Sequence, residues 1–477
     1  MDLKPELQKK LFEITSTLRF NSERQDPIES LLVDFLATPR SLDVKSEVRK
    51  VAYKEHAENA TYVEEIQRTG IFPASSWFKQ LGLLVRDVPT EHVPQYIVSK
   101  YLPFADEFEQ HYHCRWDSIM RFTMKFGEYL GFKMYQCGFD GSVYQFKSKE
   151  EYADIGFVST PSDFYIEAWT NSTTIDIGEL SRLVKPDLGR NELDYVLNLL
   201  CFDPQDGPFT NASLVLKPLI RLDKDTVVLL VNNYLMRNLP MVYEAQFSAI
   251  KAYRESKGNT FEELVKQTLR ALPFKTLAFN LSYGAGFEVD SLLELQKSNW
   301  AVEVTSHPPS MKALQGNPVA IEDDLQKSLR KCIDQGKRCL DNMDKYPLDY
   351  FGKNGKRKAI MIVVDGVYPQ LNPTTGTRFH EERETIYLIN WFDLRVIIEQ
   401  AELDKFEDFL MWRTTPPMPI ICYDERDYWA YYFDRHLKTP QMKEAYGISQ
   451  EKMLRGFYIS ARFNDKGYIG PDLLRKQ

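Results

Sequence analysis

The chain has 477 residues, 43% hydrophobic and 27% charged, and this ordinary globular composition excludes a disordered, collagen-like or coiled-coil protein. Its formal charge of −8 excludes a basic field over the whole molecule, so any nucleic-acid surface has to be a local patch. The six cysteines form no C-x-x-C pair, and no apolar run is long enough to span a bilayer. We expect a cytoplasmic, multi-domain protein without membrane contact.

Helical patterns dominate the first 150 residues. Segments 27–37 and 117–130 carry apolar residues at helical spacing. Segment 111–114, His-Tyr-His-Cys, has metal-ligating residue types but no second cluster at a useful spacing, which favours a polar helix or loop with one buried cysteine. We predict a helical N-terminal domain over residues 1–150.

Two short helices, 177–184 and 191–202, are predicted next, followed by strand-like runs at 214–222 and 226–231. This is the order of a winged helix, whose second helix can enter a major groove. Here the second helix is acidic and apolar, which favours a structural or docking role over DNA recognition. We predict a winged-helix-like or mixed α/β connector over residues 151–239.

Strand and helix then alternate up to about residue 400. Helical patterns at 240–254 and 260–272 are separated by Gly258, and an apolar strand is predicted at 359–365. The sequence therefore predicts an α/β domain over residues 240–400.

The most informative feature of this domain is a predicted hairpin. Strand-like runs at 287–295 and 300–306 flank a polar four-residue turn. A turn centred on this segment places Asp290 opposite Thr305 and makes Glu303 a diagonal neighbour of Asp290. Because successive side chains of a strand point to opposite sides, one face of the hairpin is apolar and must be buried: Phe287, Val289, Leu293, Leu295, Trp300, Val302 and Val304. The other face carries the polar residues Glu288, Asp290, Glu303, Thr305 and His307.

Two neighbouring carboxylates, Asp290 and Glu303, repel one another unless a cation lies between them. Oxygen ligands on rigid strands suit Mg²⁺ or Mn²⁺, which bind through a few carboxylates and retain several waters. Such a metal can activate a water and stabilise the charge that develops on a phosphodiester. The pattern indicates metal-dependent phosphodiester chemistry.

Three short segments in this order resemble the PD-(D/E)XK nuclease superfamily: Lys257–Glu263 opening a helix, Glu288-Val-Asp290 on one strand and Val302-Glu-Val304 on the next. The resemblance covers residues 240–400. It implies a restriction-endonuclease-like mixed β-sheet flanked by helices, with a divalent metal held by Glu262, Asp290 and Glu303. It also implies an endonuclease acting on DNA in preference to RNA, in restriction, repair or antiviral defence.

The sequence departs from the family at Thr305, where the family has a lysine that orients the attacking water and helps to neutralise the transition state. Lys266, one helical turn after Glu262, and His307 are the first candidates for a replacement. Lys312 and Lys331 are weaker ones. Without such a helper, the domain is a degenerate nuclease fold serving as a nucleic-acid-binding or scaffold subunit.

Two simpler explanations of the acidic residues stay open. In the first, the acidic strand face is simply the solvated side of a half-covered sheet. In the second, Glu262 and Glu263 interact with the dipole at the N-terminus of their helix. A metabolic α/β enzyme is disfavoured, because no glycine-rich phosphate loop or dinucleotide fingerprint follows any predicted strand.

The flanking segments offer candidate contacts to partners. A basic loop could contact phosphates or be an ordinary solvated loop, and its candidate residues are Lys353, Lys356, Arg357 and Lys358. Residues 401–477 form an aromatic-rich extension, whose rings more often pack within their own domain than stack on bases. The expected partner is nucleic acid, with a protein partner or a second copy of the chain as further candidates.

Overall fold

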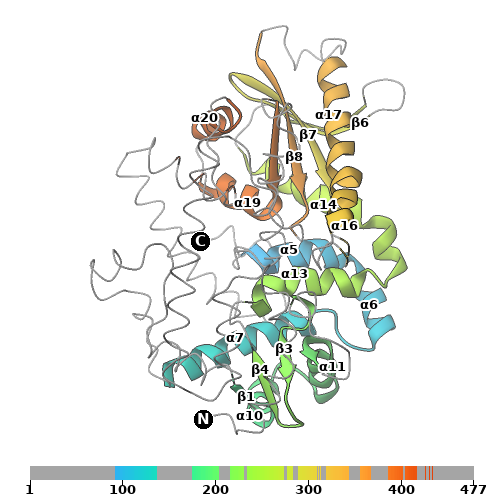
Figure 1. The fold of residues 1–477 in the computed structure, drawn as a ribbon, viewed down its shortest axis with the longest axis vertical. Coiled ribbons are helices and arrows are strands. Elements are labelled where there is room, and N and C mark those ends of the chain that lie inside the picture. The colour runs from blue at the N-terminus through green and yellow to red at the C-terminus, as the bar shows by residue number, and fades with distance from the viewer. Residues whose placement is uncertain are drawn as a thin grey trace, which may run out of the picture.

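The computed structural model describes an α/β protein with helices and two mixed β-sheets (Figure 1). It covers residues 92–136, 174–203, 215–229, 234–272, 277–282, 288–308, 318–342, 355–366, 385–400 and 403–415, with residues 310, 312, 425, 429 and 432. The expectations for segment 27–37, Phe287, Lys353 and most of 401–477 lie outside these residues.

The described N-terminal helices are α5 (Val93–Tyr101), α6 (Ala105–Tyr112) and α7 (Ser118–Gln136), with a 3₁₀ turn at Leu102–Phe104. Helix α7 confirms the helix expected at 117–130. Segment 111–114 ends α6: His113 has a left-handed φ of 53° that closes the helix, and Cys114 is buried. This agrees with the expected helix end and buried cysteine.

The connector has α10 (Ile177–Val184) and α11 (Arg190–Leu200), as the apolar spacing predicts. Four short strands form its sheet, in the order β1-β4-β3-β2: β1 (Thr174–Asp176), β2 (Cys201–Phe202), β3 (Leu219–Arg221) and β4 (Thr226–Leu229). The apolar side of α11 belongs to the main hydrophobic core through Leu193, Val196, Leu197 and Leu200. This burial agrees with a structural role for α11.

Two helices lead into the second half: α13 (Tyr234–Phe247) and α14 (Lys251–Arg270). The expected helix boundary at Gly258 is wrong. The two helices are separated at residues 248–250, and α14 runs through Gly258 without interruption. A glycine costs a helix only about 1 kcal/mol relative to alanine. Buried side chains of α14 before and after Gly258, Tyr253 and Phe261 among them, keep the helix in the core.

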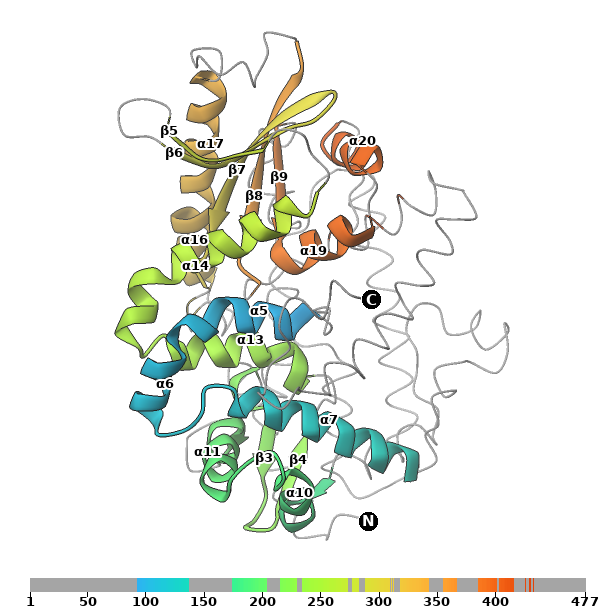
Figure 2. The same ribbon diagram turned by 180° about the vertical axis from the view of Figure 1, so that it is seen from behind.

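The larger sheet has five strands in the order β5-β6-β7-β8-β9 (Figure 2). The strands are β5 (Leu277–Ser282), β6 (Glu288–Glu294), β7 (Ser298–Thr305), β8 (Arg357–Val364) and β9 (Ile386–Asn390). Strands β5, β6 and β7 are antiparallel neighbours, whereas β7, β8 and β9 run parallel. Residues 359–364 of β8 are all buried, which explains the continuous apolar run of this central strand.

Helices cover both faces of this sheet. The remaining ones are α16 (Pro318–Leu325), a π-helical turn (Gln326–Arg330), α17 (Lys331–Asn342), α19 (Trp391–Gln400) and α20 (Leu403–Arg413). Helix α17 packs closely on one face, since a Cβ on Gly336 would lie 2.7 Å from Ile360 Cγ2. Helices α14 and α19 share the core of the other face and are joined by a 3.0 Å hydrogen bond from Trp391 Nε1 to Thr268 Oγ1.

The predicted hairpin is confirmed as β6 and β7, but the observed pairing of the two strands is shifted by two residues from the predicted pairing. Leu293 lies opposite Trp300, and Ser291 lies opposite Val302. The turn is tighter than expected, because the Leu295 N–H already bonds to Ser298 O at 2.8 Å. A shift of two residues keeps every side chain on its expected face, whereas a shift of one would reverse the faces.

The apolar face of the hairpin is sorted as expected except at one residue. Leu293, Leu295, Trp300 and Val302 are buried in the main core, and Val304 packs against it half-buried. Val289 instead joins Leu292, Ala301 and Cys339 in a smaller cluster on the α17 side. The alternation changes at the next residue, Asp290, where β6 leaves β7.

Helix α20 binds the turn between β6 and β7 through hydrogen bonds. Its Glu407 accepts hydrogen bonds from the backbone N–H groups of Gln296 and Lys297 at 3.0 and 2.7 Å, and from Ser298 Oγ at 2.7 Å. The described aromatic residues beyond α20 pack inward, with Trp429 and Tyr432 against Phe409 of α20. Both rings are buried, as the packing explanation of the aromatic extension expects.

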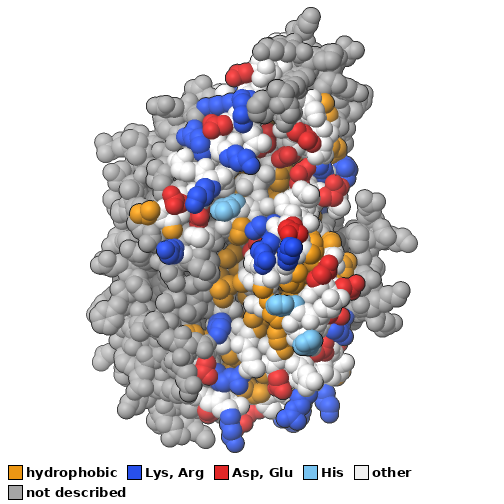
Figure 3. All heavy atoms as spheres, turned by 90° about the vertical axis from the view of Figure 1, so that its right-hand side faces the viewer, with side chains coloured by type: hydrophobic (Ala, Val, Ile, Leu, Met, Phe, Trp, Pro, Cys, Tyr) orange, Lys and Arg blue, Asp and Glu red, His pale blue; other side chains and the backbone are white. Residues whose placement is uncertain are grey.

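On the face that carries α6, α16 and α17, positively and negatively charged side chains are interspersed in the upper part, and hydrophobic side chains gather in the middle (Figure 3). Within the described ranges, no helix has both the length and the hydropathy to cross a bilayer.

Candidate metal centre

Strands β6 and β7 separate at Asp290, and we call this point the fork. The last regular pair is Ser291 with Val302, so the continued register brings Asp290 level with Glu303. Asp290 Oδ2 accepts a 2.8 Å hydrogen bond from the backbone N–H of Val304. A side chain thus takes the place of a strand carbonyl, and the two carboxylates lie opposite one another instead of diagonally as the sequence predicted.

Glu303 has an unusual environment for a carboxylate. It is 2% exposed, and its Oε1 has no hydrogen-bond partner in the described structure. Burial, followed by the nearby charge of Asp290, raises the pKa of Glu303 to about 9. A buried carboxylate oxygen without a donor is costly and calls for either a proton or a cation.

Helix α14 and strand β5 complete the fork. Glu262 accepts hydrogen bonds from Lys266 and from Asn280 Nδ2, the latter at 2.9 Å, and Lys266 also donates to Asn280 Oδ1. Asn280 lies level with Asp290, between the pairs Phe279–Ser291 and Leu281–Val289, and has a left-handed φ of 50°.

The charge of the fork is unbalanced. Three carboxylates, Glu262, Asp290 and Glu303, lie close enough to interact electrostatically, and one lysine, Lys266, is bonded among them. Lys331 and Arg338 of α17 also act on Glu303 electrostatically. Burial raises the pKa of Asp290 to about 6, with the Val304 N–H opposing the shift and Glu262 adding to it. The carboxyl groups of Asp290 and Glu303 are therefore both protonated more readily than usual.

The residues present fit a divalent ion held by few protein ligands. Among the described residues, no three His, Cys, Asp or Glu side chains gather in a metal-binding group. This agrees with the position of Glu262, whose Oε1 is bonded to Lys266 and Asn280. Mg²⁺ is commonly held by one or two carboxylates together with waters and substrate phosphates, so Asp290 and the unpartnered Glu303 oxygen are the protein groups that would hold it.

The simpler explanations of these acidic residues do not hold. Helix α17 covers the strand face that carries Glu303, which is therefore not the solvated side of a sheet. Glu262 and Glu263 lie well inside α14 and not in its first turn, as the expected helix start had placed them.

Of the helper candidates, the structure brings Lys266 to the fork. Lys266 is 6% exposed. The His307 side chain points elsewhere, with Nε2 3.7 Å from Asp324 Oδ1, and it is 45% exposed. Thr305 is buried beside the thiol of Cys332. Lys331 and Lys312 are exposed, and Lys331 acts on Glu303 from α17 by lowering its pKa against the dominant effect of burial.

The predicted basic loop lies at the other end of the sheet. Lys356 Nζ bonds to Glu294 Oε1 at 2.7 Å and to Leu295 O at 2.8 Å, and Arg357 donates to Thr414 O at 2.7 Å. Lys358 is level with Asn299 on β7, four residues and about 13 Å from the level of Glu303. Lys356 and Arg357 thus join parts of the fold to one another.

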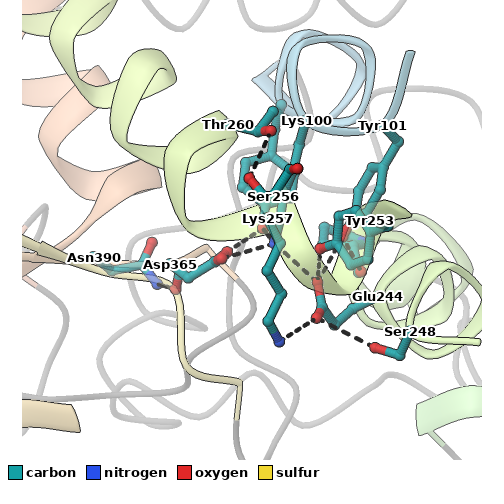
Figure 4. Close-up of polar contacts among 12 residues, drawn as sticks. Lys100, Tyr101, Glu244, Ser248, Tyr253, Ser256, Lys257, Thr260, Asp365 and Asn390 are labelled. Carbon is teal, nitrogen blue, oxygen red and sulfur yellow. Dashed lines mark hydrogen bonds and ion pairs between the residues drawn. The ribbon is translucent and has the colours of Figure 1, made fainter. Parts of the chain in front are cut away.

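A second buried cluster, the Lys100 network, was not foreseen (Figure 4). Lys100 is fully buried and bonds to Glu244 Oε2 at 2.9 Å and to Asp365 Oδ2 at 2.7 Å. Hydroxyls of three tyrosines complete the network: Tyr96 donates to Asp365, and Tyr101 and Tyr253 donate to Glu244. The network joins α5 to α13 and to the end of β8.

The sequence carries a signal for this network. Lys100 follows Val93, Tyr96 and Ile97 at helical spacing, so it is a lysine on an apolar stripe. Asp365 comes directly after the buried strand β8. Asn280 gives no comparable signal, because its position depends on the backbone conformation of β5.

No family model, no curated protein and no solved structure matches this chain.

Proposed function

We propose that this chain is a divalent-metal-dependent nuclease with a restriction-endonuclease-like domain over residues 240–400. The observation that carries the proposal is the buried, unpartnered Oε1 of Glu303 next to Asp290. A catalytic site tolerates such an unfavourable arrangement because the substrate-bound state needs it. The mixed five-stranded sheet with helices on both faces supports the fold assignment.

In this proposal each residue of the fork has a definite task. Asp290 and Glu303 hold Mg²⁺ or Mn²⁺, which when bound lowers the pKa of a water and stabilises charge on a phosphodiester. Lys266 orients Glu262 through their ion pair and offsets negative charge from the helix side. The hydrogen bond from the Val304 N–H to Asp290 Oδ2 fixes the side chain of Asp290 in its rotamer. Nucleic acid is the substrate, DNA in preference to RNA, in the cytoplasm and in restriction, repair or antiviral defence.

One observation favours a second candidate function. At the position of the missing lysine, β7 carries the uncharged Thr305, whose side chain is buried beside Cys332. If Lys266 does not replace that lysine, the domain is a degenerate nuclease fold that binds nucleic acid or a protein partner without cleaving.

The test incubates the purified full chain with plasmid, linear duplex, single-stranded DNA and RNA, each with Mg²⁺, Mn²⁺ or chelator. We expect cleavage that the chelator abolishes and that Asp290→Ala and Glu303→Ala remove. Glu294→Ala is the matched control, because Glu294 also lies on β6 but pairs with Lys356 away from the fork. Cleavage by both fork variants at the wild-type rate would place the active site elsewhere. The absence of cleavage of all four substrates would favour the degenerate fold.

A further inference from the structure

Strands β5 and β6 both lose their regular alternation beside the fork. On β5, Ala278 and Leu281 pack against the smaller cluster on the α17 side, although they are three residues apart. On β6, Val289 and Leu292 belong to the same cluster and are also three residues apart. Side chains on one face of a regular strand are separated by an even number of positions. Each strand therefore contains one irregular residue, and on β5 this residue is Asn280.

The backbone of Asn280 explains the irregularity of β5. Its φ of 50° lies in the left-handed region, where asparagine is one of the few residues with a side chain that is found routinely. Two successive side chains of β5 consequently contact α14. The guanidinium carbon of Arg270 lies 4.6 Å from the centre of the Phe279 ring. The Asn280 amide bonds to Glu262 and Lys266, whereas a regular strand would point it or its neighbour to the α17 side.

The amide of Asn280 matches both of its partners chemically. Lys266 can only donate hydrogen bonds, and the Glu262 carboxylate can only accept them. The Asn280 oxygen accepts from Lys266, and its nitrogen donates to Glu262 Oε1 at 2.9 Å. Glycine tolerates the same φ but has no amide, and aspartate would lack the donor and add a negative charge. Asparagine thus meets the backbone and the side-chain requirement together.

These contacts restrain Lys266. Because Lys266 also donates to Glu262 Oε1, the lysine, the glutamate and the amide form a closed triangle. A lysine and a glutamate one turn apart on a helix otherwise form a weak pair between two flexible side chains. Asn280 adds a contact from a second element, and regular strand pairs on either side of it hold its backbone in place.

We propose that Asn280 is a positioning residue of the fork, which fixes the Lys266 ammonium beside Glu262 for contact with the substrate's phosphate. This inference rests on the proposed function and adds a residue to which that function gives no task. An ammonium has three N–H donors, and among the described residues two of those of Lys266 find acceptors. The third is available to a phosphate, whose developing charge a fixed cation stabilises.

The first measurement is reductive methylation of the metal-free protein, with formaldehyde and a hydride donor in chelator, followed for each lysine by mass spectrometry. The variant is Asn280→Gly, because glycine keeps the left-handed backbone and removes the amide. Ser282→Gly is the matched control, since Ser282 is exposed on the same strand and lies outside the triangle. Two lysines serve as internal references: the buried Lys100 reports global unfolding, and Lys251, 80% exposed, reports the reagent.

We expect Lys266, which is 6% exposed, to be methylated at least about tenfold faster in Asn280→Gly than in wild type. This is the order of effect of losing a hydrogen bond to a charged group. Lys100 and Lys251 should keep their wild-type rates, and Ser282→Gly should leave Lys266 unchanged. An unchanged Lys266 in Asn280→Gly, an equal acceleration in Ser282→Gly, or faster methylation of Lys100 as well would overturn the inference.

The second measurement connects the position of Lys266 with the rate. With Mn²⁺, Asn280→Gly should lower kcat by about 10²-fold with little change in KM, since a misplacement of about 1 Å can cost that much. The double variant Asn280→Gly with Lys266→Ala should be no slower than Lys266→Ala, because Asn280 acts through Lys266. A wild-type kcat in Asn280→Gly, or losses that multiply in the double variant, would contradict the role of Asn280.

A failure here is distinguishable from a failure of the proposed function. Metal-dependent cleavage that requires Asp290 and Glu303, together with an unchanged Asn280→Gly variant, rejects the role of Asn280 alone. A wild type that cleaves none of the four substrates rejects the proposed function, and methylation then decides whether Asn280 fixes Lys266.

Discussion

The Lys100 network and the fork are both buried clusters of charge, but they differ in charge balance. In the network, two lysines, Lys100 and Lys257, face two carboxylates, Glu244 and Asp365. Burial alone would raise the pKa of Glu244, but Lys100, together with the Tyr253 hydroxyl and Lys257, lowers it to about 2. In the fork, Glu303 keeps an oxygen without a donor, and burial raises its pKa to about 9.

The difference separates structural from functional burial of charge. A balanced cluster is complete within the chain, so it can connect α5, α13 and β8 without any ligand. In the fork, Lys266 is bonded to Glu262, and Lys331 and Arg338 act on Glu303 only electrostatically, so the buried Glu303 oxygen is left without a hydrogen-bond donor. Both clusters are buried, and the unpartnered oxygen of Glu303 is the reason why we propose the fork as the site.

The largest expected effect concerns activity at the fork. Glu303→Gln should reduce cleavage with Mn²⁺ by about 10³-fold or more, because the amide cannot supply a charged metal ligand. Its thermal midpoint without metal should equal or exceed that of wild type, since the neutral amide resembles the protonated carboxyl. Single-turnover cleavage and a thermal melt in chelator measure the two quantities. A large loss of stability would make Glu303 a structural residue.

The Lys100 network should show the opposite behaviour. Lys100→Met leaves Glu244 and Asp365 buried without their lysine and should lower the free energy of unfolding by about 3 to 5 kcal/mol. Adding Glu244→Gln and Asp365→Asn should restore part of this loss. Denaturant unfolding of the single and triple variants checks the prediction. A Lys100→Met protein as stable as wild type would refute the account of the network.

Lys266→Ala should slow cleavage by about 10² to 10⁴-fold, as expected when a positioned charge is removed. His307→Ala should leave the rate unchanged, because His307 pairs with Asp324. Comparison of the two rates under the same Mn²⁺ conditions decides which residue replaces the family's lysine. Full activity in Lys266→Ala would remove it from that role.

The stability of the fold without metal should also depend on pH. The pKa of Glu303 is about 9 in the fold against a usual value of 4.5, so between these values the folded chain holds an extra proton. Stability without metal must then fall as pH rises, by at most about 1.4 kcal/mol per pH unit for one proton. Asp290, with a pKa of about 6, adds to the fall near pH 4 to 6.

Melting curves in chelator from pH 5 to 9 measure this fall. It should be shallower in Glu303→Gln than in wild type, and parallel curves would show that Glu303 does not hold the proton.

Local patterns in the sequence predicted much of the fold. The period-two runs around Asp290 and Glu303 and the polar turn between them predicted a hairpin, and the apolar run at 359–364 predicted β8. They could not predict the register, because Glu407, more than a hundred residues away, holds the turn. Nor could they predict that α14 runs through Gly258, which buried neighbours such as Phe261 decide.

The candidate site was predicted in part. The sequence placed Asp290, Glu303, Glu262 and Lys266 together, since strand and helix periods determine their faces. Asn280 was missed because its place depends on a left-handed φ in β5. The contacts of the basic loop could not be predicted either, because Lys356 and Arg357 bond to residues distant in sequence, which no local pattern reveals.

Isothermal titration of Mn²⁺ into the full chain at pH 7.5 tests the central claim most directly. Metal binding should displace the proton from Glu303, so the heat should depend on the ionisation enthalpy of the buffer. We predict saturable binding with proton release in wild type and loss of both in Glu303→Gln. Wild type without saturable Mn²⁺ binding, or a Glu303→Gln variant that binds as wild type does, would contradict the claim that the fork needs a cation.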